Sequence, residues 1–342
     1  MFKDLVPRLQ CPACGRAALR AHAFRESRAR ILDGALGCAC GAAYAIEGGM
    51  LSLVQPALIE PEPAGRFAAR FARELTDAGL RLPQATESHT VGAQLAQRRH
   101  FDWFAENDEQ SYSAYQSSPF WVAEDALTFE RWRARLETGA WLLDIGCANG
   151  RSVWPLLSSD LRIVGCDISA RLVRQAIARA EAGGVSDRTC FIVADCDRLP
   201  FVDDSFQYVL TYGVLHHLPD PARACRDIQR VLARGGIHFG SENNRTVFRT
   251  LFDALMRWRP LWIEKAGAEP LISEAMLREW MHGLPVRLRC VTSVFVPPHL
   301  VNAAGHGMAR GLLSLSDRVA RLVPVLRGQG GLIVFDAQKT AV

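Results

Sequence analysis

The sequence predicts an α/β fold, with a mostly parallel sheet and helices on both of its faces. Between Trp141 and Phe239, short apolar runs alternate with segments whose apolar residues recur at helical spacing, which is the pattern of repeated βαβ units. Two more strand-like runs occupy residues 286–296 and 331–337. The 342 residues are enough for a large domain and a smaller one.

Composition divides the chain into three parts. Residues 1–55 hold four closely spaced cysteines and end in a strand-like stretch, so a small β domain is expected there. Residues 56–137 open with the proline-bearing segment PALIEPEPAG, expected to be a linker, and continue as a helical cap region. Residues 138–342 carry the α/β pattern and form the third part.

Charge and hydropathy narrow the class of protein. The net charge is only +4 with neutral histidines, and no dense stripe of Lys and Arg is seen, which disfavours a dedicated nucleic-acid binder. No run of eighteen apolar residues occurs, so no transmembrane segment is expected. The first residues do not follow the pattern of a secretory signal, so a cytoplasmic location is predicted. Oligomeric state is not fixed by these features.

The first predicted strand ends in an acid and a turn of small residues. Trp141–Leu143 are apolar, Asp144 follows, and Gly146, Ala148 and Gly150 leave room for a ligand beside the backbone. This glycine-rich turn also occurs in dinucleotide enzymes. Asp144 would repel a pyrophosphate bound there but would attract the ammonium group of an amino acid. The turn therefore favours a ligand with an amino-acid tail.

The next strands end in polar side chains as well. RIVGCD ends in Asp167, where a carboxylate can accept hydrogen bonds from both hydroxyls of a ribose. TCFIVAD ends in Asp195, which can accept a hydrogen bond from the amine of adenine. A fourth strand, from Gln207 to Tyr212, leads to a loop with two adjacent histidines. Together these strand ends indicate a nucleoside site.

Five segments in residues 141–241 resemble successive motifs of class I S-adenosylmethionine-dependent methyltransferases: LLDIGCANG, VGCDIS, ADCDRLPF, SFQYVLTYGVLHHLPD and VLARGGIHFG. The resemblance implies a Rossmann-like sheet of seven mostly parallel strands with helices on both faces and an antiparallel last strand. Residues 286–296 and 331–337 would supply its sixth and seventh strands. It also implies S-adenosyl-L-methionine as cofactor.

The same resemblance implies ten cofactor-binding residues at the ends of four strands. The methionine would lie against the first turn, the ribose against the second strand end, the adenine between the second and third, and the sulfonium above the fourth. In that order the residues are Asp144, Gly146, Cys147, Asn149 and Gly150, then Asp167, Ile168, Asp195 and Cys196, and last Thr211. The sequence departs from the family at Ala148, where glycine is frequent, and at Gln207, where an acid is usual.

His216 and His217 are the candidate catalytic residues, because they follow the fourth strand where an acceptor would enter. Histidine titrates near neutral pH, so either could take a proton from a hydroxyl. The favoured interpretation is that the pair only anchors its loop through hydrogen bonds.

A small-molecule acceptor is the preferred interpretation of the acceptor side. TYGV, at the end of the fourth strand, lacks the Asn/Asp-Pro-Pro-aromatic motif found in many nucleic-acid amino-methyltransferases. Aromatic residues that could line an apolar acceptor site are Tyr112, Tyr115, Phe120, Trp121 and those of a helix expected over residues 247–262. An RNA methyltransferase and a non-catalytic binding module are the alternatives.

Cys11, Cys14, Cys38 and Cys40 form the candidate metal site, since two closely spaced thiolate pairs can hold one tetrahedral Zn²⁺. The region resembles the zinc-ribbon-like domain that precedes some bacterial methyltransferases. Ribosomal RNA guanine methyltransferases also carry a zinc module, but a histidine in its second pair is missing here. The alternative is a β domain that keeps its thiols buried without metal. Arginines that could contact phosphate are Arg16, Arg20, Arg25, Arg28 and Arg30.

Overall fold

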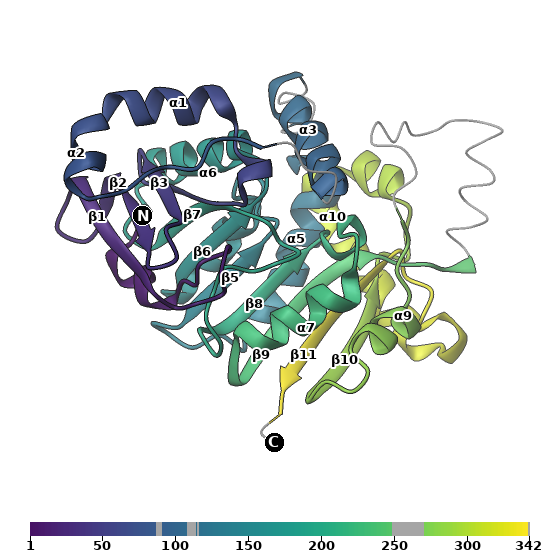
Figure 1. The fold of residues 1–342 in the computed structure, drawn as a ribbon. Coiled ribbons are helices and arrows are strands. Elements are labelled where there is room, and N and C mark those ends of the chain that lie inside the picture. The colour runs from purple at the N-terminus through teal and green to yellow at the C-terminus, as the bar shows by residue number, and fades with distance from the viewer. Residues whose placement is uncertain (87–90, 108–113, 115, 248–269, 341–342) are drawn as a thin grey trace.

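The protein is represented by a computed structural model that describes residues 1–86, 91–107, 114, 116–247 and 270–340. Tyr112, Tyr115 and nearly all of the helix expected over residues 247–262 lie outside the described residues. A single mixed sheet crosses the molecule, with helices on both faces (Figure 1). Its strands are β1 (Leu19–Glu26), β2 (Ile31–Cys38), β3 (Ala43–Glu47), β4 (Met50–Leu53), β5 (Trp141–Ile145), β6 (Arg162–Asp167), β7 (Thr189–Ala194), β8 (Phe206–Tyr212), β9 (Leu232–Asn243), β10 (Val286–Ser293) and β11 (Leu332–Lys339).

The strand order is β1-β2-β3-β4-β7-β6-β5-β8-β9-β11-β10. The run from β7 to β9 is parallel throughout, as the alternating pattern predicted. The two C-terminal apolar runs form β10 and β11, and β11 is antiparallel to both of its neighbours. The predicted α/β class and the antiparallel last strand are therefore confirmed.

The prediction of a seven-stranded sheet is wrong for the described residues, because β1 to β4 belong to the same eleven-stranded sheet. β4 pairs with β7 in parallel, and Leu51 lies opposite Ile192. Without β4, the outer backbone groups of β7 would be an unpaired sheet edge. The N-terminal strands cover that edge, so the sheet continues across the expected boundary.

Helices pack on both faces of the sheet. Those named here are α1 (Pro61–Arg70), α2 (Ala72–Asp77), α3 (Gly92–Asn107), α5 (Pro119–Arg133), α6 (Ala170–Ala182), α7 (Pro221–Val231), α9 (Glu274–Trp280) and α10 (Pro298–Leu322), with the 3-10 segments η1 (Lys3–Arg8), η2 (Pro56–Leu58), η4 (Arg151–Ser159), η5 (Leu215–His217) and η6 (Pro324–Leu326). Apolar side chains of α5, η4 and α6 form one core layer, and those of η1, α7 and α9 form the other.

The segment PALIEPEPAG is not a plain linker, which corrects the prediction. Pro56 begins η2 and Pro61 begins α1. Proline is compatible with the first turn of a helix, since the amide hydrogen it lacks has no partner within the helix there. The prolines therefore mark helix starts.

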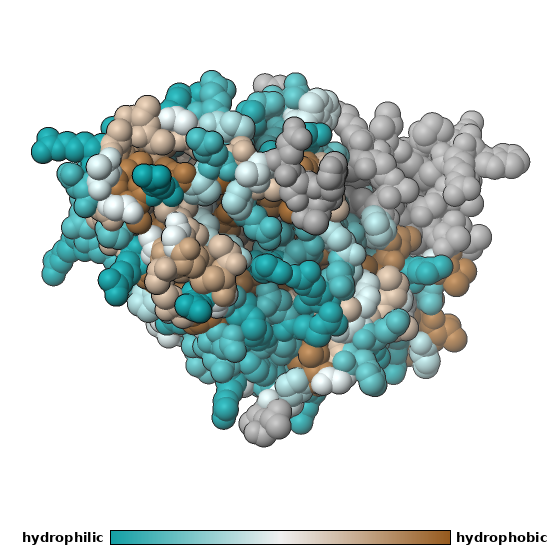
Figure 2. Space-filling model, in the orientation of Figure 1, coloured by the Kyte–Doolittle hydropathy of each residue, from teal (hydrophilic) through white to brown (hydrophobic). Residues whose placement is uncertain are grey.

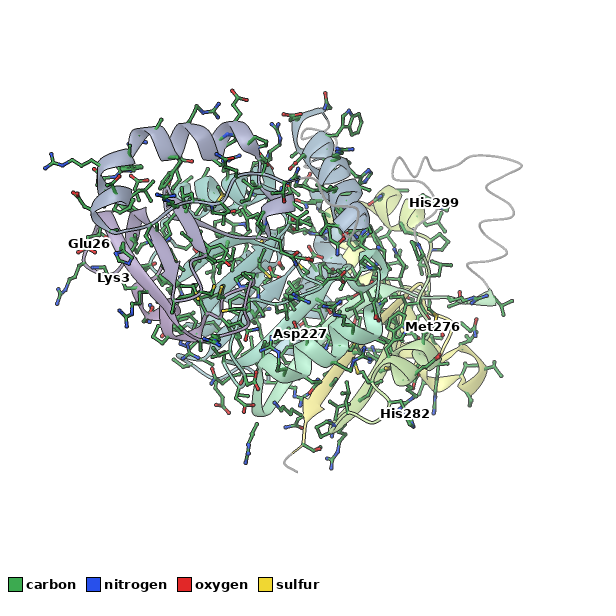
Figure 3. All side chains as sticks on the ribbon, in the orientation of Figure 1. Lys3, Glu26, Asp227, Met276, His282 and His299 are labelled. Carbon is green, nitrogen blue, oxygen red and sulfur yellow. The ribbon has the colours of Figure 1, made fainter. Side chains whose placement is uncertain are left out.

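Contacts on two sides hold the N-terminal strands. On the side away from the rest of the sheet, Lys3 pairs with Glu26 at 3.0 Å (Figure 3). On the side toward the rest of the sheet, the backbone N–H of Gln10 donates to the carbonyl of Pro200, and the backbone N–H of Val202 donates to the carbonyl of Arg8.

The visible face in Figure 2 is mostly hydrophilic, with hydrophobic side chains over the N-terminal strands and at its right edge. Within the described residues, no helix combines the length and the hydropathy needed to span a bilayer.

Candidate functional site

Asp144, Asp167 and Asp195 come to the carboxyl ends of three adjacent parallel strands. Asp144 lies near the end of β5, Asp167 ends β6, and Asp195 follows β7. All three are buried, at 1%, 7% and 8% exposure. The backbone N–H of Ala148 donates to Asp167 Oδ2 at 2.9 Å, and that of Ser169 donates to Oδ1 at the same distance. The first turn is thereby tied to the second acid.

Gly146 and Gly150 have positive φ angles of 67° and 79°, which only glycine adopts without strain. A Cβ on Gly146 would also lie 2.6 Å from a methyl carbon of Val214. Within this turn, Cys147 and Asn149 are buried. The turn is therefore shaped by its small residues, and Ala148 joins it with a positive φ of 45°.

Burial raises the pKa of Asp144 to about 7, and the nearby charge of Asp167 adds to the rise. The hydroxyl of Ser152 donates to Asp144 and opposes that rise. Burial also raises the pKa of Asp167 and that of Asp195. A cluster of buried carboxylates with few cations beside them is suited to a ligand that carries positive charge and hydrogen-bond donors.

Asp197 belongs to the same edge and was missed by the sequence reasoning. Its backbone N–H donates to Asp195 Oδ1 at 2.9 Å, and its side chain is buried. Its Oδ1 atom has no hydrogen-bond partner within the described residues. Burial and the charge of Asp195 raise the pKa of Asp197 to about 6. The second acid in ADCD was the signal available in the sequence.

Helix α3 lies across these strand ends. Gln94 donates to Asp197 Oδ2 at 3.1 Å, and Gln97 donates to the carbonyl of His217. Farther along α3, Asp102 accepts a hydrogen bond from the hydroxyl of Ser169 at 2.6 Å. The helix thus reaches from the β7 side to the β8 side and shields the carboxylates from water.

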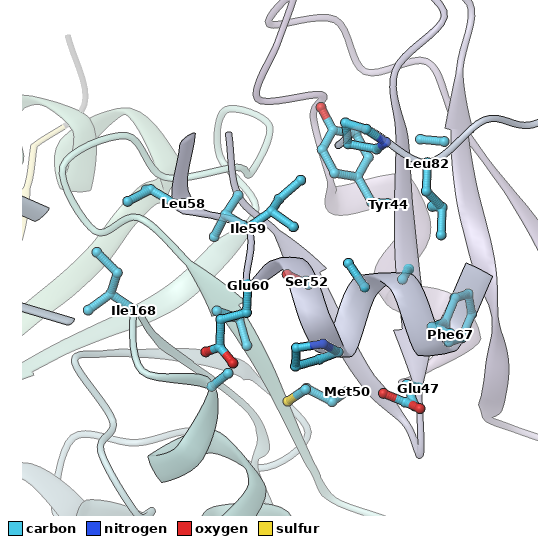
Figure 4. Close-up of a pocket in the computed structure, with 18 of the residues that line it drawn as sticks. Tyr44, Glu47, Met50, Ser52, Leu58, Ile59, Glu60, Phe67, Leu82 and Ile168 are labelled. Carbon is cyan, nitrogen blue, oxygen red and sulfur yellow. The ribbon is translucent and has the colours of Figure 1, made fainter. Parts of the chain in front are cut away.

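Ile168, Cys196 and Thr211 are all buried. Ile168 lines a cavity of about 90 Å³, which it shares with Met50 and Leu58 (Figure 4). Thr211 differs from the three acids in its contacts. Its hydroxyl lies 2.8 Å from Nε2 of His238 in β9. Its side chain is therefore engaged in the core between β8 and β9.

Glu242, at the end of β9, organises the loop after β8. Its Oε1 accepts hydrogen bonds from the backbone N–H groups of Val214 and Leu215 at 3.0 and 2.7 Å. Its Oε2 lies 2.6 Å from Nδ1 of His216, whose side chain is only 3% exposed. This contact joins residues that are far apart in the sequence, so no local pattern revealed it.

Replacing Glu242 by alanine is expected to lower the free energy of unfolding by about 3 kcal/mol, because buried donors on Val214, Leu215 and His216 lose their acceptor. Glu242→Gln keeps one acceptor oxygen and is expected to cost about half as much. Urea unfolding followed by circular dichroism measures both. Equal stability of Glu242→Ala and the unchanged protein would refute this role.

His217 lies against α3. Its ring is 5.4 Å from that of Phe101 and 3.9 Å from that of His216. Burial and the neighbouring His216 lower the pKa of His217 to about 3. The imidazole is therefore neutral at pH 7 and a weak base.

A second polar cluster lies beside β8. Asp125 of α5 receives three charge-assisted hydrogen bonds from Arg151, at 3.0, 2.6 and 2.7 Å, and one from the hydroxyl of Tyr212 at 2.6 Å. The guanidinium of Arg151 also lies 4.8 Å from the ring centre of Trp121. These contacts fix the start of α5 against the loop that follows Gly150.

The four predicted cysteine ligands come together. Their sulfur atoms all lie within 4.8 Å of one another, with Cys11 3.7 Å from Cys40 and Cys14 3.6 Å from Cys38. Zinc with four sulfur ligands at about 2.3 Å requires sulfur atoms about 3.8 Å apart. The hydroxyl of Tyr44 contacts the sulfur of Cys11 at 3.2 Å. The cluster therefore fits one tetrahedral metal ion.

Residues 143–240 match the family described as a methyltransferase domain. The 27-O-demethylrifamycin SV methyltransferase of Amycolatopsis mediterranei (strain S699) is 35% identical over 147 residues, which are 40% of this chain and 54% of that protein. Ajmaline N-methyltransferase of Rauvolfia serpentina is 28% identical over 138 residues, 40% of this chain and 47% of that protein. The tRNA methyltransferase 9B protein of Mus musculus is 31% identical over 134 residues, 36% and 27% of the two chains.

The chain spans about half the length of the first two relatives. The matched residues run from within β5 into β9 and include all three strand-end acids. Residues 143–240 are therefore similar in sequence to a methyltransferase domain.

Proposed function

We propose that this protein transfers a methyl group from S-adenosyl-L-methionine to a small, apolar or aromatic acceptor. The observation that carries the proposal is the placement of Asp144, Asp167 and Asp195 at adjacent strand ends beneath α3. The bound cofactor supplies an activated methyl group on a sulfonium. The protein then has to align the acceptor with that methyl and exclude water.

In this proposal the strand ends would hold the cofactor in a definite order. Asp144 would accept hydrogen bonds from the ammonium of the methionine, and the turn formed by Gly146 and Gly150 would carry its carboxylate end. Asp167 would accept both ribose hydroxyls. Asp195 would accept the adenine amine, while Ile168 and Cys196 would pack on the ring and its edge. Asp197, with its unpartnered oxygen, adds a second acceptor beside the adenine.

Binding of S-adenosylhomocysteine is expected to weaken about tenfold from pH 8 to pH 6. The pKa of Asp144 is raised to about 7, so its carboxylate is mostly ionised at pH 8 and mostly protonated at pH 6. An ammonium group binds the ionised form, and complex formation therefore releases a proton as the pH falls through 7. Isothermal titration calorimetry at both pH values measures the change.

Asp144→Asn is expected to bind weakly at both pH values, with a flat profile. Asp197→Asn is the matched control, because its pKa of about 6 lies lower and its expected partner is a neutral amine. That variant should retain the slope between pH 8 and pH 7. A slope that survives in Asp144→Asn contradicts the assignment of this carboxylate.

His216 acts as an anchor of the loop in this proposal. Its Nδ1 is held by Glu242, and its side chain is buried. His217 is too weak a base, at a pKa of about 3, to remove a proton from an alcohol. An acceptor atom that reacts without a strong protein base, such as an acidic hydroxyl or a neutral amine, is consistent with these roles of the two histidines.

The acceptor class is proposed from the relatives and from the walls of the site. The names of two relatives describe methyl transfer to a rifamycin and to ajmaline. Trp121 and Tyr212 place aromatic rings beside Arg151, which pairs with Asp125.

RNA is the second candidate substrate, favoured by the relative named as a tRNA methyltransferase. Two arginines near the cysteines are already engaged within the protein: Arg25 pairs with Asp33, and Arg30 donates to the carbonyl of Thr189. This leaves fewer cations free for phosphate contacts in the N-terminal part.

Incubation with methyl-labelled cofactor tests the function directly. The protein is offered a small-molecule extract in one reaction and total RNA in the other, with Asp167→Asn as the inactive control. Label in the organic fraction supports the proposal, and label in RNA supports the alternative. Binding of S-adenosylhomocysteine without transfer to either pool supports a non-catalytic module.

We further propose that Cys11, Cys14, Cys38 and Cys40 hold a structural Zn²⁺. Their sulfur spacing supports this assignment. The division at residues 55 and 137 and the cytoplasmic location stay predictions.

A further inference from the structure

The C-terminal helix α10 and the turn after it expose large hydrophobic side chains. The exposed fractions are 65% for Met308, 62% for Leu315, 51% for Val319, 79% for Leu322 and 78% for Val325. Single exposed hydrophobic residues are ordinary on a protein surface, whereas a contiguous group marks an interaction site.

Four of these side chains, with Leu312, form one stripe along α10. Residues 308, 312, 315, 319 and 322 are separated by alternating steps of four and three, which keeps them on one side of a helix. An adjacent side of the helix carries the buried residues Ala309, Leu313 and Ala320 and packs against α5. The helix therefore has one apolar side in the core and a second one in solvent.

The charged side chains of α10 and η6 are mostly positive, although Arg310 pairs with the exposed Glu130 of α5. Arg310, Arg318, Arg321 and Arg327 lie on α10 or just after η6. Arg318 is three residues after Leu315 and four before Leu322, so it borders the stripe directly. In α10 and η6 the single acid is Asp317, which is buried and pairs with Arg131 and Arg321.

We propose that the stripe of Met308, Leu312, Leu315, Val319 and Leu322, with Val325, docks on the surface of an anionic lipid bilayer. A helix with an exposed apolar side flanked by arginines lies in the plane of such a surface, its apolar side chains among the acyl chains and its guanidinium groups at the phosphates. Arg310 and Arg321 already pair with Glu130 and Asp317, so anionic headgroups would supply counter-charge chiefly to Arg318 and Arg327.

A second copy of the chain is the poorer occupant. Two such stripes packed together would bring the Arg318 side chains that border them close to each other, with no exposed acid on α10 or η6 to pair with them. Like charges at a helix interface oppose association. The lipid surface satisfies both the apolar and the cationic part of the patch.

Sedimentation with vesicles tests this proposal. The full chain is mixed with vesicles of phosphatidylglycerol and phosphatidylcholine, or of phosphatidylcholine alone, at about 0.1 M salt. The anionic vesicles are expected to bind at least about tenfold more protein than the neutral ones, and a Leu315→Gln/Leu322→Gln double variant is expected to lose about tenfold in binding. Arg318→Glu should weaken binding to the anionic vesicles alone.

Matched controls use exposed residues elsewhere. Two variants serve as controls, Val291→Gln on β10 and Arg234→Glu near the start of β9. Both should bind vesicles as the unchanged protein does. Circular dichroism confirms that every variant is folded. Equal binding to both vesicle types, or no binding to either, would overturn the proposal. So would a dimer in light scattering that becomes monomeric in the double variant, because the stripe would then join two copies.

Discussion

Asp167→Asn is expected to lower the affinity for S-adenosylhomocysteine about a hundredfold. Two hydrogen bonds from ribose hydroxyls to an ionised carboxylate contribute about 1.5 kcal/mol each, and the amide keeps at most one of them. The carboxylate also accepts hydrogen bonds from the backbone N–H groups of Ala148 and Ser169. Its amide replacement would turn a donor toward one of these N–H groups and disturb the first turn. Calorimetry at pH 8 measures the affinity.

Asp187→Asn provides the control for this change. It removes the same charge from an exposed position after α6, in the loop that leads to β7. Its affinity for S-adenosylhomocysteine should equal that of the unchanged protein. A comparison of thermal unfolding midpoints separates weakened binding from loss of the fold. If Asp167→Asn binds as tightly as Asp187→Asn, the ribose assignment fails.

The arrangement of the strand ends could be predicted because it depends on local patterns. Trp141–Leu143, RIVGC and TCFIVA are apolar runs of strand length, each closed by an acid. Parallel strands joined by helices place their carboxyl ends on the same edge of the sheet. Asp144, Asp167 and Asp195 therefore had to come close together once the α/β class was correct. Their roles in binding stay predictions that the variants above test.

Other features depend on contacts between distant parts of the chain. Nothing local in MLSL indicates that Leu51 lies opposite Ile192, so the joining of the N-terminal strands to the main sheet was missed. The hydrogen bonds from α3 to Asp197 and Ser169 also join residues that are far apart in the sequence. Helical periodicity likewise shows that α10 has apolar sides, but not which side the core covers. Burial resolves that question only in three dimensions.

Loss of the cysteine cluster is expected to lower the thermal unfolding midpoint by about 10 °C. A structural zinc contributes folding free energy because four thiolates bind it only when they are brought together. In a chain of this size a loss of several kcal/mol corresponds to a shift of about that magnitude. The test compares zinc content, by mass spectrometry of the metal, and unfolding midpoint in the unchanged protein and in Cys14→Ser/Cys38→Ser. Zinc should be near one per chain in the first and absent in the second.

Cys290→Ser is the matched control, because Cys290 is a half-buried thiol on β10 that lies outside the cluster. It should keep both the zinc and the unfolding midpoint. The cluster is also connected to the methyltransferase-like part of the sheet. The backbone N–H of Gln10, the residue before Cys11, donates to the carbonyl of Pro200, in the turn that follows Asp195. Loss of zinc should therefore loosen the adenine side of the site and weaken S-adenosylhomocysteine binding, while Cys290→Ser leaves it unchanged. A zinc-free preparation that unfolds at the same temperature as the zinc-loaded protein would exclude a structural metal.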